Sequence, residues 1–378
     1  MAEPGLRIVF VVTEDWYFWS HRLDLARAAR AAGHAVHVAT RTTAHRDRIA
    51  AEGFAILEMP FERSLRHPLR DLAAVFALAA ALRRIAPDVV HLVALKPMLL
   101  AGLAILALPR TRFVHAVTGM GYLFSSSDRR ARGLRRVLIA ALRVILARPN
   151  CHVIAQNADD AELLERNGLG SAARRTLIAG SGVDIARFRP SPLPAEPLVV
   201  LPARMIRDKG IEEFVAAARL LKRSGVAVRL VLVGGTDPDN PAAIPERELA
   251  AWVAAGAVAW WGQRDDMPAV YAQASIVCLP SYREGLPKVL LEAAACGRPL
   301  VATDVPGCRA ICRPGVSGIL VPARDPQALA AALATLAADP ERSAALGRGG
   351  RTLVEREFSA ARIAAETLAL YARLHASA

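Results

Sequence analysis

Short apolar runs alternate with longer amphipathic segments along most of this chain of 378 residues. In the first half, the apolar runs are rich in valine and isoleucine and predict strands over residues 7–12, 35–40, 89–93, 112–117 and 152–156. Between them, apolar residues recur every three or four positions, which predicts helices over 21–32, 69–85, 98–106 and 130–147. Strands that alternate with helices in this way form parallel sheets whose faces the helices cover.

The alternation is interrupted at residues 181–197, where SGVDIARFRPSPLPAEP carries four prolines in its last eight residues. Proline fixes the backbone and removes a hydrogen-bond donor, so this segment predicts a linker between two domains. Beyond it the alternation resumes, with strands predicted over 198–203, 228–234, 258–261, 276–280, 300–303 and 318–321. Helices are predicted there over 211–224, 249–255, 267–274, 288–296 and 326–337.

The predicted fold class is α/β, with two doubly wound, Rossmann-like domains that face a cleft. We expect an N-terminal domain over residues 1–186, a C-terminal domain over 187–356 and a final helix over 357–378 that packs back toward the N-terminal domain. Ligands of open parallel sheets bind beyond the carboxyl ends of the strands. Candidate site residues should therefore directly follow strands.

Composition narrows the class of protein. Hydrophobic residues make up 53% and charged residues 22% of the chain, so it can bury two cores and is not a disordered protein. The five cysteines lack the spacing of a zinc site and are expected as reduced thiols, as in a cytoplasmic protein. The mean hydropathy is +0.27. Even so, the uncharged stretches are shorter than the roughly 18 residues of a membrane-spanning helix, and acidic residues after the first apolar run argue against a signal peptide.

The net charge of +13 is concentrated in the first half of the chain. Residues 1–190 contain 27 Arg or Lys against 16 Asp or Glu, whereas residues 191–378 contain 21 against 19. No zinc finger, RNA-binding signature or basic zipper accompanies this charge, so nucleic acid is not an expected partner. Residues 129–148 instead alternate arginine with Leu, Val and Ile, like an amphipathic helix on an anionic membrane, and residues 63–70 would extend that surface. The alternative is an ordinary surface helix packed on its own sheet.

One pair of cations follows the first predicted strand of the second half. Arg204 lies just beyond that strand, and Lys209 lies one loop later, before a helix. Two cations at the start of a helix suit a diphosphate. A solvated charged loop is the alternative.

A pair of glutamates brackets the start of a later helix. Glu284 lies in the loop of SYREGLPKVLLEAAACGRPL, and Glu292 lies two helical turns onward among apolar residues. A carboxylate in apolar surroundings needs hydrogen-bond donors, which ribose or sugar hydroxyls supply. An ion pair of Glu292 with Arg298 or Arg283 is the alternative.

Several segments together resemble the retaining glycosyltransferases of family 4, which have the GT-B fold. They are SGVDIARFRP, LPARMIRDKG, VLVGG, the run from WWGQRDD to VATDVPG, and the terminal FSAARIAAETLALYARL. This resemblance covers essentially the whole chain. The stretches TEDWYFWSHR and TGMGYLF are similar to those of a subgroup that adds an N-acetylated hexosamine to an undecaprenyl-diphosphate-linked sugar in bacterial surface-glycan assembly.

The resemblance implies a role for each matching residue. Arg204 and Lys209 would hold the nucleotide diphosphate and neutralise the leaving group, so that the reaction would require no metal ion. Glu284 would contact the donor sugar and act with these two cations in catalysis, while Glu292 would hold the ribose and residues 261–266 would lie near the base. The remaining donor-binding positions would be Gly234, Gly262, Gly285, Leu286 and Pro287. Asp237 and Asp239 form a DxD by letter, which we interpret as a turn.

The first half departs from the family pattern at two places. The usual glycine pair after the first strand is replaced by a polar stretch, in which Glu14 and Asp15 are candidates for binding acceptor hydroxyls or for capping the next helix. The histidine that many relatives carry after the fourth strand is replaced by Thr118, so Thr118 and Gly119 are the candidate cleft-lining groups. His115 is expected inside the strand.

The resemblance thus implies an enzyme that moves a sugar from a nucleotide donor, UDP-HexNAc, to a polyprenyl-diphosphate-linked saccharide with retained configuration. It would need no cofactor and would act as a peripheral protein on the cytoplasmic face of an anionic membrane. A nucleotide-sugar 2-epimerase and a non-catalytic nucleotide-sugar-binding protein are the alternatives.

Overall fold

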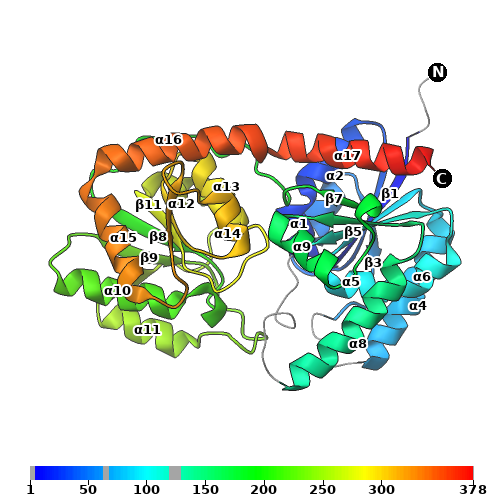
Figure 1. Ribbon diagram of the computed structural model, residues 1–378, viewed down its shortest axis with the longest axis horizontal. Helices are drawn as coiled ribbons and strands as arrows, with labels where there is room; N and C mark the ends of the chain where they lie inside the picture. The colour runs from blue at the N-terminus through cyan, green and yellow to red at the C-terminus, as the bar shows by residue number, and fades with distance from the viewer. Residues whose placement is uncertain (1–4, 63–67, 119–128, 378) are drawn as a thin grey trace. The chain divides into compact units, whose positions relative to one another are not determined.

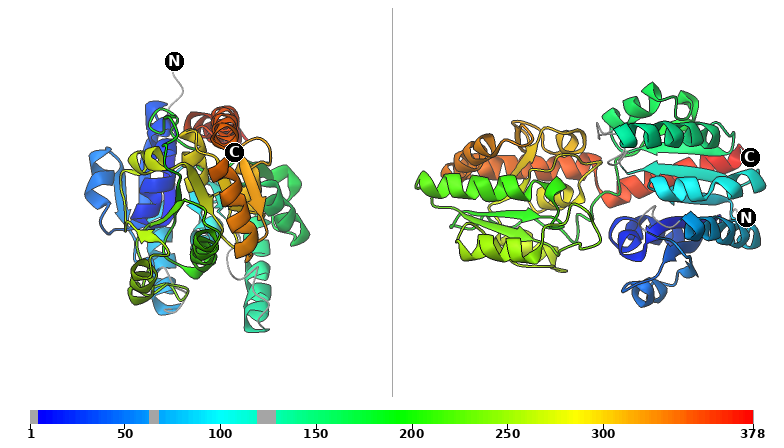
Figure 2. Two further views of the ribbon diagram at one scale, coloured as in Figure 1. Left: turned by 90° about the vertical axis from the view of Figure 1, so that its left-hand side faces the viewer. Right: turned by 90° about the horizontal axis from the view of Figure 1, so that it is seen from below.

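The computed structural model describes residues 5–62, 68–118 and 129–377 (Figure 1). The chain divides into two compact units: unit 1 comprises Met1–Ser181 with Ala360–Ala378, and unit 2 comprises Gly182–Ser359. The sequence placed the corresponding boundaries after residues 186 and 356. Each unit is a parallel sheet with helices on both of its faces (Figure 2).

Unit 1 contains a seven-stranded parallel sheet in the order β3-β2-β1-β4-β5-β6-β7. Its strands are β1 (Arg7–Glu14), β2 (Ala35–Arg41), β3 (Ala55–Glu58), β4 (Val89–Val93), β5 (Arg112–Val117), β6 (Cys151–Ala155) and β7 (Arg175–Leu177). The central strands are buried along their length because helices cover both faces, which explains their unbroken apolar runs. The edge strands β3 and β7 are only four and three residues long, and the sequence did not predict them.

Nine described helices surround this sheet. They are α1 (Asp15–His21), α2 (Leu23–Ala31), α3 (Arg46–Ala51), α4 (Pro68–Ile85), α5 (Leu95–Leu100), α6 (Gly102–Ala107), α8 (Arg129–Leu146), α9 (Ala158–Arg166) and α17 (Ala360–Ala376), with a 3₁₀ turn η1 (Ala172–Arg174). The first helix begins at Asp15 rather than at residue 21. The consecutive aromatic residues of α1 hide any helical period, yet Phe18 of α1 packs edge-on against Phe10 and Phe54 in the core.

The two faces of the sheet in unit 1 have separate cores. One face packs against α4, α5 and α8, with Leu78, Met98 and Leu142 among its buried residues. The opposite face packs against α1, α2 and α17. The helix α17 is tied to this face by a 2.7 Å hydrogen bond between the Tyr371 hydroxyl and His91 Nδ1.

Unit 2 repeats the architecture with a six-stranded parallel sheet in the order β10-β9-β8-β11-β12-β13. Its strands are β8 (Leu198–Pro202), β9 (Arg229–Val233), β10 (Ala259–Trp260), β11 (Ile276–Leu279), β12 (Leu300–Thr303) and β13 (Gly318–Val321). Its helices are α10 (Ile211–Arg223), α11 (Glu246–Ala254), α12 (Met267–Gln273), α13 (Lys288–Ala295), α14 (Pro306–Ile311), α15 (Pro326–Ala338) and α16 (Pro340–Glu357), with a 3₁₀ turn η2 (Arg207–Lys209). The sequence analysis did not predict α14 or α16.

The five cysteines are buried free thiols. Within the part of the chain that the structure describes, no helix combines the length and the apolarity needed to cross a bilayer.

Candidate functional site

The cation Arg204 lies two residues beyond β8, at the carboxyl edge of the sheet of unit 2. Its Nη1 lies 2.5 Å from Oδ2 of Asp237, which follows β9 and is 8% exposed. A buried carboxylate beside a half-exposed guanidinium fixes the direction of that guanidinium. The interpretation of Asp237 as a turn residue was therefore incomplete, because this carboxylate also holds Arg204.

The second cation, Lys209, ends the 3₁₀ turn η2. Its Nζ lies 2.5 Å from Oε1 of Glu284, and the two side chains are 22% and 11% exposed. Gly210 follows with φ +69°, and a Cβ there would lie 2.1 Å from the carbonyl oxygen of Pro280. Only glycine permits this turn, which brings η2 against the end of β11 and so places Lys209 beside the loop that carries Glu284.

The loop with Glu284 rests on the start of α14. A Cβ at Gly307 would lie 2.3 Å from the carbonyl oxygen of Gly285 and 2.8 Å from that of Glu284. The backbone of the loop therefore contacts α14 at Gly307, and a larger residue at position 307 would push the loop away. Gly307 acts as a spacer that sets the position of Glu284.

Glu292 lies on α13, about one turn from its start, and is 9% exposed. Its Oε2 accepts a 2.9 Å hydrogen bond from the hydroxyl of Tyr271 on α12. Burial raises the pKa of Glu292, although the charge of Lys288 and the Tyr271 hydroxyl act in the opposite direction. The alternative from the sequence, an ion pair with Arg298 or Arg283, is wrong, because no ion pair among the described residues joins Glu292 to either arginine.

Those two arginines have other partners. Arg298 donates to the backbone carbonyls of Ser191, Pro192 and Ala274, and Arg283 Nη2 lies 2.6 Å from Oδ2 of Asp208. The carboxylate of Glu292 is thus held by a neutral phenol rather than by a guanidinium.

The start of α13 lies between the two glutamates. Its N-cap residue is Pro287, which has no side chain that could cap the helix by a hydrogen bond. The first N–H groups of a helix have no partner within the helix and carry a partial positive charge. This edge can therefore receive a negatively charged group beside Lys209.

Two predicted donor-site glycines shape the neighbouring edge of the sheet. Gly234 has φ +146°, and a Cβ there would lie 1.8 Å from the carbonyl oxygen of Ala203, the residue before Arg204. Its N–H donates to the carbonyl of Gly262 at 2.8 Å. Gly262, with φ +67°, has open space where its Cβ would be. The predicted loop of residues 261–266 therefore joins the same edge through backbone contacts.

The structure gives the acidic residues of unit 1 a different setting from the expected one. Glu14 ends β1 and is paired with Arg41 at 2.9 Å. Asp15 is fully buried, and its carboxylate accepts hydrogen bonds from the Thr43 backbone, the Thr43 hydroxyl and the His45 backbone. Burial raises the pKa of Asp15, but these hydrogen bonds outweigh it and lower the pKa.

The expected cap on a helix near residue 20 is therefore wrong. The helix begins at Asp15 itself, and the Asp15 carboxylate instead fixes the loop after β2. Glu14 is the better placed of the two for a ligand, because its Oε1 is buried without a hydrogen-bond partner in the described part of the chain.

The other candidates of unit 1 lie at the end of β5. His115 is fully buried within that strand, and burial lowers its pKa to about 3, so its ring is neutral. Thr118 is half-buried just beyond β5. Gly119 lies outside the described residues.

The amphipathic segment 129–148 forms α8, and its main apolar stripe is used in the core. Leu138, Leu142 and Leu146 pack beneath the sheet of unit 1, as the alternative of an ordinary surface helix predicts. Val137 and Val144 remain exposed, at 68% and 69%. Residues 63–67 of the proposed extension lie outside the described residues.

Comparisons with known proteins identify the family. A family model described as "Glycosyl transferase 4-like" matches residues 7–157, and one described as "Glycosyl transferases group 1" matches residues 196–339. The chain belongs to these glycosyltransferases. The sequence-based assignment to family 4 and to the GT-B fold is confirmed.

Individual relatives of this glycosyltransferase differ in their reactions. It is 26% identical over 317 residues to the Campylobacter jejuni N,N'-diacetylbacillosaminyl-diphospho-undecaprenol alpha-1,3-N-acetylgalactosaminyltransferase, covering 80% of this chain and 82% of the relative. Among solved structures, sucrose-phosphate synthase from Thermosynechococcus elongatus matches with a TM-score of 0.82 and 25% identity, covering 98% and 100% of the two chains. Anabaena HepE, solved with UDP and glucose, matches with a TM-score of 0.76 and 20% identity over 96% and 99%.

The sequence did not predict the contacts that three residues make in this candidate site. Asp237 had a signal, since the acidic DPD follows an apolar strand as Arg204 does. The sequence signal at Gly307 was weaker: it is a glycine directly after the proline that begins a helix. Its role is evident only from its close approach to Gly285 in the structure. Tyr271 had none, because its hydroxyl reaches Glu292 from a different helix.

Proposed function

We propose that this glycosyltransferase moves an N-acetylated hexosamine from a UDP-sugar to a saccharide linked to polyprenyl diphosphate, with retention of the anomeric configuration. The observation that carries the proposal is the match to the undecaprenol-linked N-acetylgalactosaminyltransferase, which extends through both units rather than one. The UDP complex of HepE, which shares the fold, supports a uridine nucleotide as the donor's leaving group.

In the proposed reaction, the bond between the anomeric carbon and the diphosphate oxygen breaks while a bond to the acceptor oxygen forms on the same face. UDP and the proton of the acceptor hydroxyl are the other products. Arg204 and Lys209 supply positive charge where the diphosphate departs, and such charge stabilises a transition state most when it is already in position. Asp237 and Glu284 hold the two cations in that position.

Glu284 is proposed to contact the donor sugar. Its Oε1 meets Lys209, so a sugar hydroxyl would share the carboxylate with the cation that holds the diphosphate. Glu292, fixed by Tyr271, is proposed to accept from the ribose hydroxyls. Gly234, Gly262, Gly285, Leu286 and Pro287 would contribute backbone to the same donor site, and Glu14 and Thr118 remain the proposed acceptor-side groups.

We further propose that unit 1 rests on an anionic membrane as a peripheral protein. On α4, Leu69, Leu72 and Phe76 share one helical face and are 82%, 52% and 58% exposed. On the adjoining α6, Leu106 is 58% exposed. Exposed apolar side chains on the half of the chain with surplus arginine suit a surface of anionic lipid.

The first experiment is a thermal-shift screen of the purified protein with UDP, GDP, ADP and several UDP-sugars. UDP and a UDP-HexNAc should raise the melting temperature more than the other nucleotides. The second is release of UDP from that donor with and without an extracted polyprenyl-diphosphate saccharide, followed by NMR of the new anomeric proton. Conversion of the donor without acceptor would favour the 2-epimerase, and an inverted product would contradict retention.

A further inference from the structure

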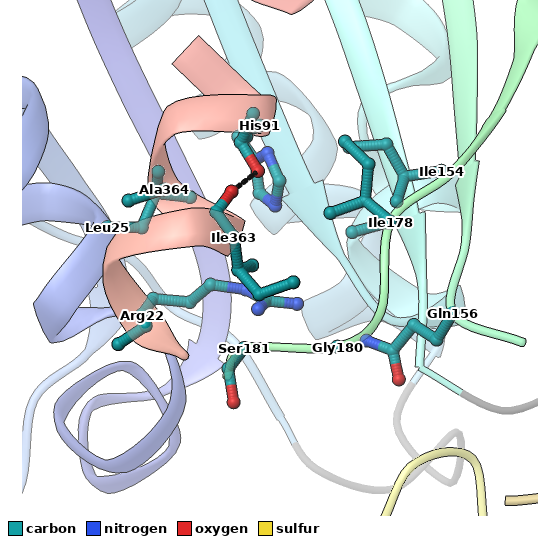
Figure 3. Close-up of a pocket in the computed structure, with 13 residues that line it drawn as sticks. Arg22, Leu25, His91, Ile154, Gln156, Ile178, Gly180, Ser181, Ile363 and Ala364 are labelled. Atoms are coloured by element: carbon teal, nitrogen blue, oxygen red, sulfur yellow. Dashed lines mark hydrogen bonds between the residues drawn. The ribbon is translucent and has the colours of Figure 1, made fainter. Parts of the chain in front are cut away.

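A small cavity in unit 1 surrounds the side chain of Arg22, the residue that joins α1 to α2 (Figure 3). The rest of its lining comes from α2, α17, β4, β5, β6 and the residues directly after β6 and β7, and nearly all of it is buried. Only Gly180 and Ser181, which follow β7, are half-buried, so they mark the mouth. The mouth thus lies at the carboxyl edge of the sheet, where ligands of open α/β sheets bind.

Arg22 is 3% exposed and carries a charge that the described protein does not balance. Its Nε has no hydrogen-bond partner, and within the described ranges only the His21 carbonyl accepts from the guanidinium, 3.3 Å from Nη1. No ion pair among the described residues includes Arg22. A buried cation without a counter-ion destabilises the folded state, so such a residue calls for an anion.

The groups around Arg22 do not supply that anion. His91 lines the cavity, and its Nδ1 meets the Tyr371 hydroxyl while its Nε2 has no partner among the described residues. Burial and the charge of Arg22 lower the pKa of His91, so its ring is neutral. Burial raises the pKa of Tyr371, so the phenol is also neutral. Arg22 is therefore the charged group of the cavity.

Two polar side chains converge on the mouth. Figure 3 shows the Arg22 side chain extending past Ile363 toward Gly180 and Gln156. The amide of Gln156 and the hydroxyl of Ser181 have no hydrogen bond to the chain as far as it is described. The first turn of α17 contributes Ala360 to the lining, and the start of a 17-residue helix adds positive potential.

The space limits what can enter. The cavity leaves about 10 Å³ for the centre of a water molecule. This is room for one water or for one oxygen atom of a larger anion. A phosphoryl group would place one oxygen against Arg22 and its other oxygens at Gln156 and Ser181.

We propose that Arg22 binds a phosphoryl oxygen at the mouth of this cavity, with Gln156 and Ser181 as further donors, and that the group bound is the diphosphate of the lipid-linked acceptor. The second half of this inference rests on the proposed function. The first half, an anion site at Arg22, stands on the buried guanidinium and its unpartnered neighbours alone.

Inorganic pyrophosphate tests the anion site directly, with inorganic phosphate and acetate compared beside it. Because Arg204 and Lys209 are expected to bind diphosphate as well, the titration is made in an Arg204→Ala/Lys209→Ala background. Pyrophosphate should raise the melting temperature of this protein, and Arg22→Met should weaken the apparent affinity at least tenfold. The matched control is Arg30→Met, which removes an exposed arginine from α2, the helix that follows Arg22, and should leave the affinity unchanged.

Gln156→Leu provides a second variant in case Arg22→Met does not fold, and it should weaken pyrophosphate binding by a smaller factor. Equal affinity in the background protein, Arg22→Met and Gln156→Leu would overturn the site and leave only an ordered water there. A stronger response to acetate than to pyrophosphate would overturn the phosphoryl assignment.

Steady-state kinetics of the otherwise native enzyme tests the source of the phosphoryl group. Arg22→Met should raise KM for the lipid-linked acceptor at least tenfold while leaving KM for the nucleotide sugar unchanged. If Arg22→Met lost pyrophosphate binding but kept the acceptor KM, the bound group would not be the diphosphate of the acceptor. The site would then be assigned to a free phosphate compound. Because the pyrophosphate titration needs no turnover, failure of the proposed function would not be mistaken for failure of the site.

Discussion

Lys209 Nζ lies 2.5 Å from Glu284 Oε1, although 75 residues separate the two along the chain. This contact joins the η2 turn after β8 to the loop after β11, and it makes each side chain the positioning partner of the other. Replacing either residue therefore removes its own side chain and also leaves the side chain of the other residue without its positioning partner.

Lys209→Met should lower turnover by about 10²- to 10³-fold, the usual effect of removing one group that stabilises developing charge. It should also weaken UDP binding, because this cation is proposed to contact the diphosphate. Glu284→Ala should reduce turnover far more than UDP affinity. Turnover is measured as UDP release and affinity by calorimetry.

The control for Lys209 is Lys222→Met, an exposed lysine at the end of α10 in the same unit, which should behave as wild type. If Glu284→Ala reduced turnover and UDP affinity by the same factor, the assignment of Glu284 to the sugar would be wrong.

Gly307→Ala tests the backbone contact that positions Glu284. The new Cβ would lie 2.3 Å from the carbonyl oxygen of Gly285, so the loop must move away from α14. Moving the loop away from this contact should lower turnover by one to two orders of magnitude, because misplaced catalytic groups lose most of their effect. The melting temperature and UDP release are measured on the same preparation.

A matched glycine lies in α8. A Cβ at Gly133 meets nothing within 4 Å, so Gly133→Ala should keep full activity and stabilise the protein by up to about 1 kcal/mol, since alanine favours a helix. Wild-type activity in Gly307→Ala would show that the loop does not need its present position.

Tyr271→Phe removes the hydroxyl that donates to Glu292. A buried acceptor left without its donor costs about 1–3 kcal/mol, so the free energy of unfolding should fall by that amount. Saturating UDP should restore part of the loss if ribose hydroxyls replace the phenol. Denaturant unfolding with and without UDP measures both effects, and a loss that UDP does not reduce would contradict the ribose assignment for Glu292.

The sequence was sufficient for what depends on local pattern. The strands β4, β5 and β12 have the predicted bounds because both faces are buried, which makes each an unbroken apolar run between turn residues. The sequence could also place Arg204 and Lys209 beyond a strand, because β8 is an unbroken apolar run and both cations follow it.

Contacts that join distant segments could not be read from the pattern. The pairing of Arg204 with Asp237 and of Glu292 with Tyr271 depends on register between strands and on the direction of helices. Arg22 illustrates the same limit, since within the sequence it is one arginine of an amphipathic helix, and only the packing of α17 buries it.

The proposed membrane surface predicts a loss of vesicle binding when apolar side chains of α4 become charged. Leu69→Asp/Phe76→Asp should abolish sedimentation with phosphatidylglycerol vesicles, because both side chains are more than half exposed and free to enter the interface. Val253→Asp, at an exposed position on α11 of unit 2, is the control and should sediment as wild type. Unchanged sedimentation of the double variant would exclude this face.

Asp160, in the first turn of α9, predicts a specific pH dependence of stability. It is 8% exposed, and its Oδ2 accepts a 2.9 Å hydrogen bond from Asn157. Burial raises its pKa from 3.8 to about 6. Between these two values the folded protein binds more protons than the unfolded chain, so this group lowers the free energy of unfolding as the pH rises from about 4 to about 6.

Asp160→Asn keeps an oxygen that can accept from Asn157 and removes the charge that burial disfavours. The variant should therefore be more stable than wild type at pH 7, by up to about 2 kcal/mol, and the difference should shrink toward pH 4 and vanish only below about pH 3, where the wild-type carboxyl is protonated in both states. Urea unfolding of the two proteins at several pH values measures the difference. A constant difference across this range would mean that Asp160 titrates at its ordinary pKa, and that the capping contact with Asn157 compensates fully for burial.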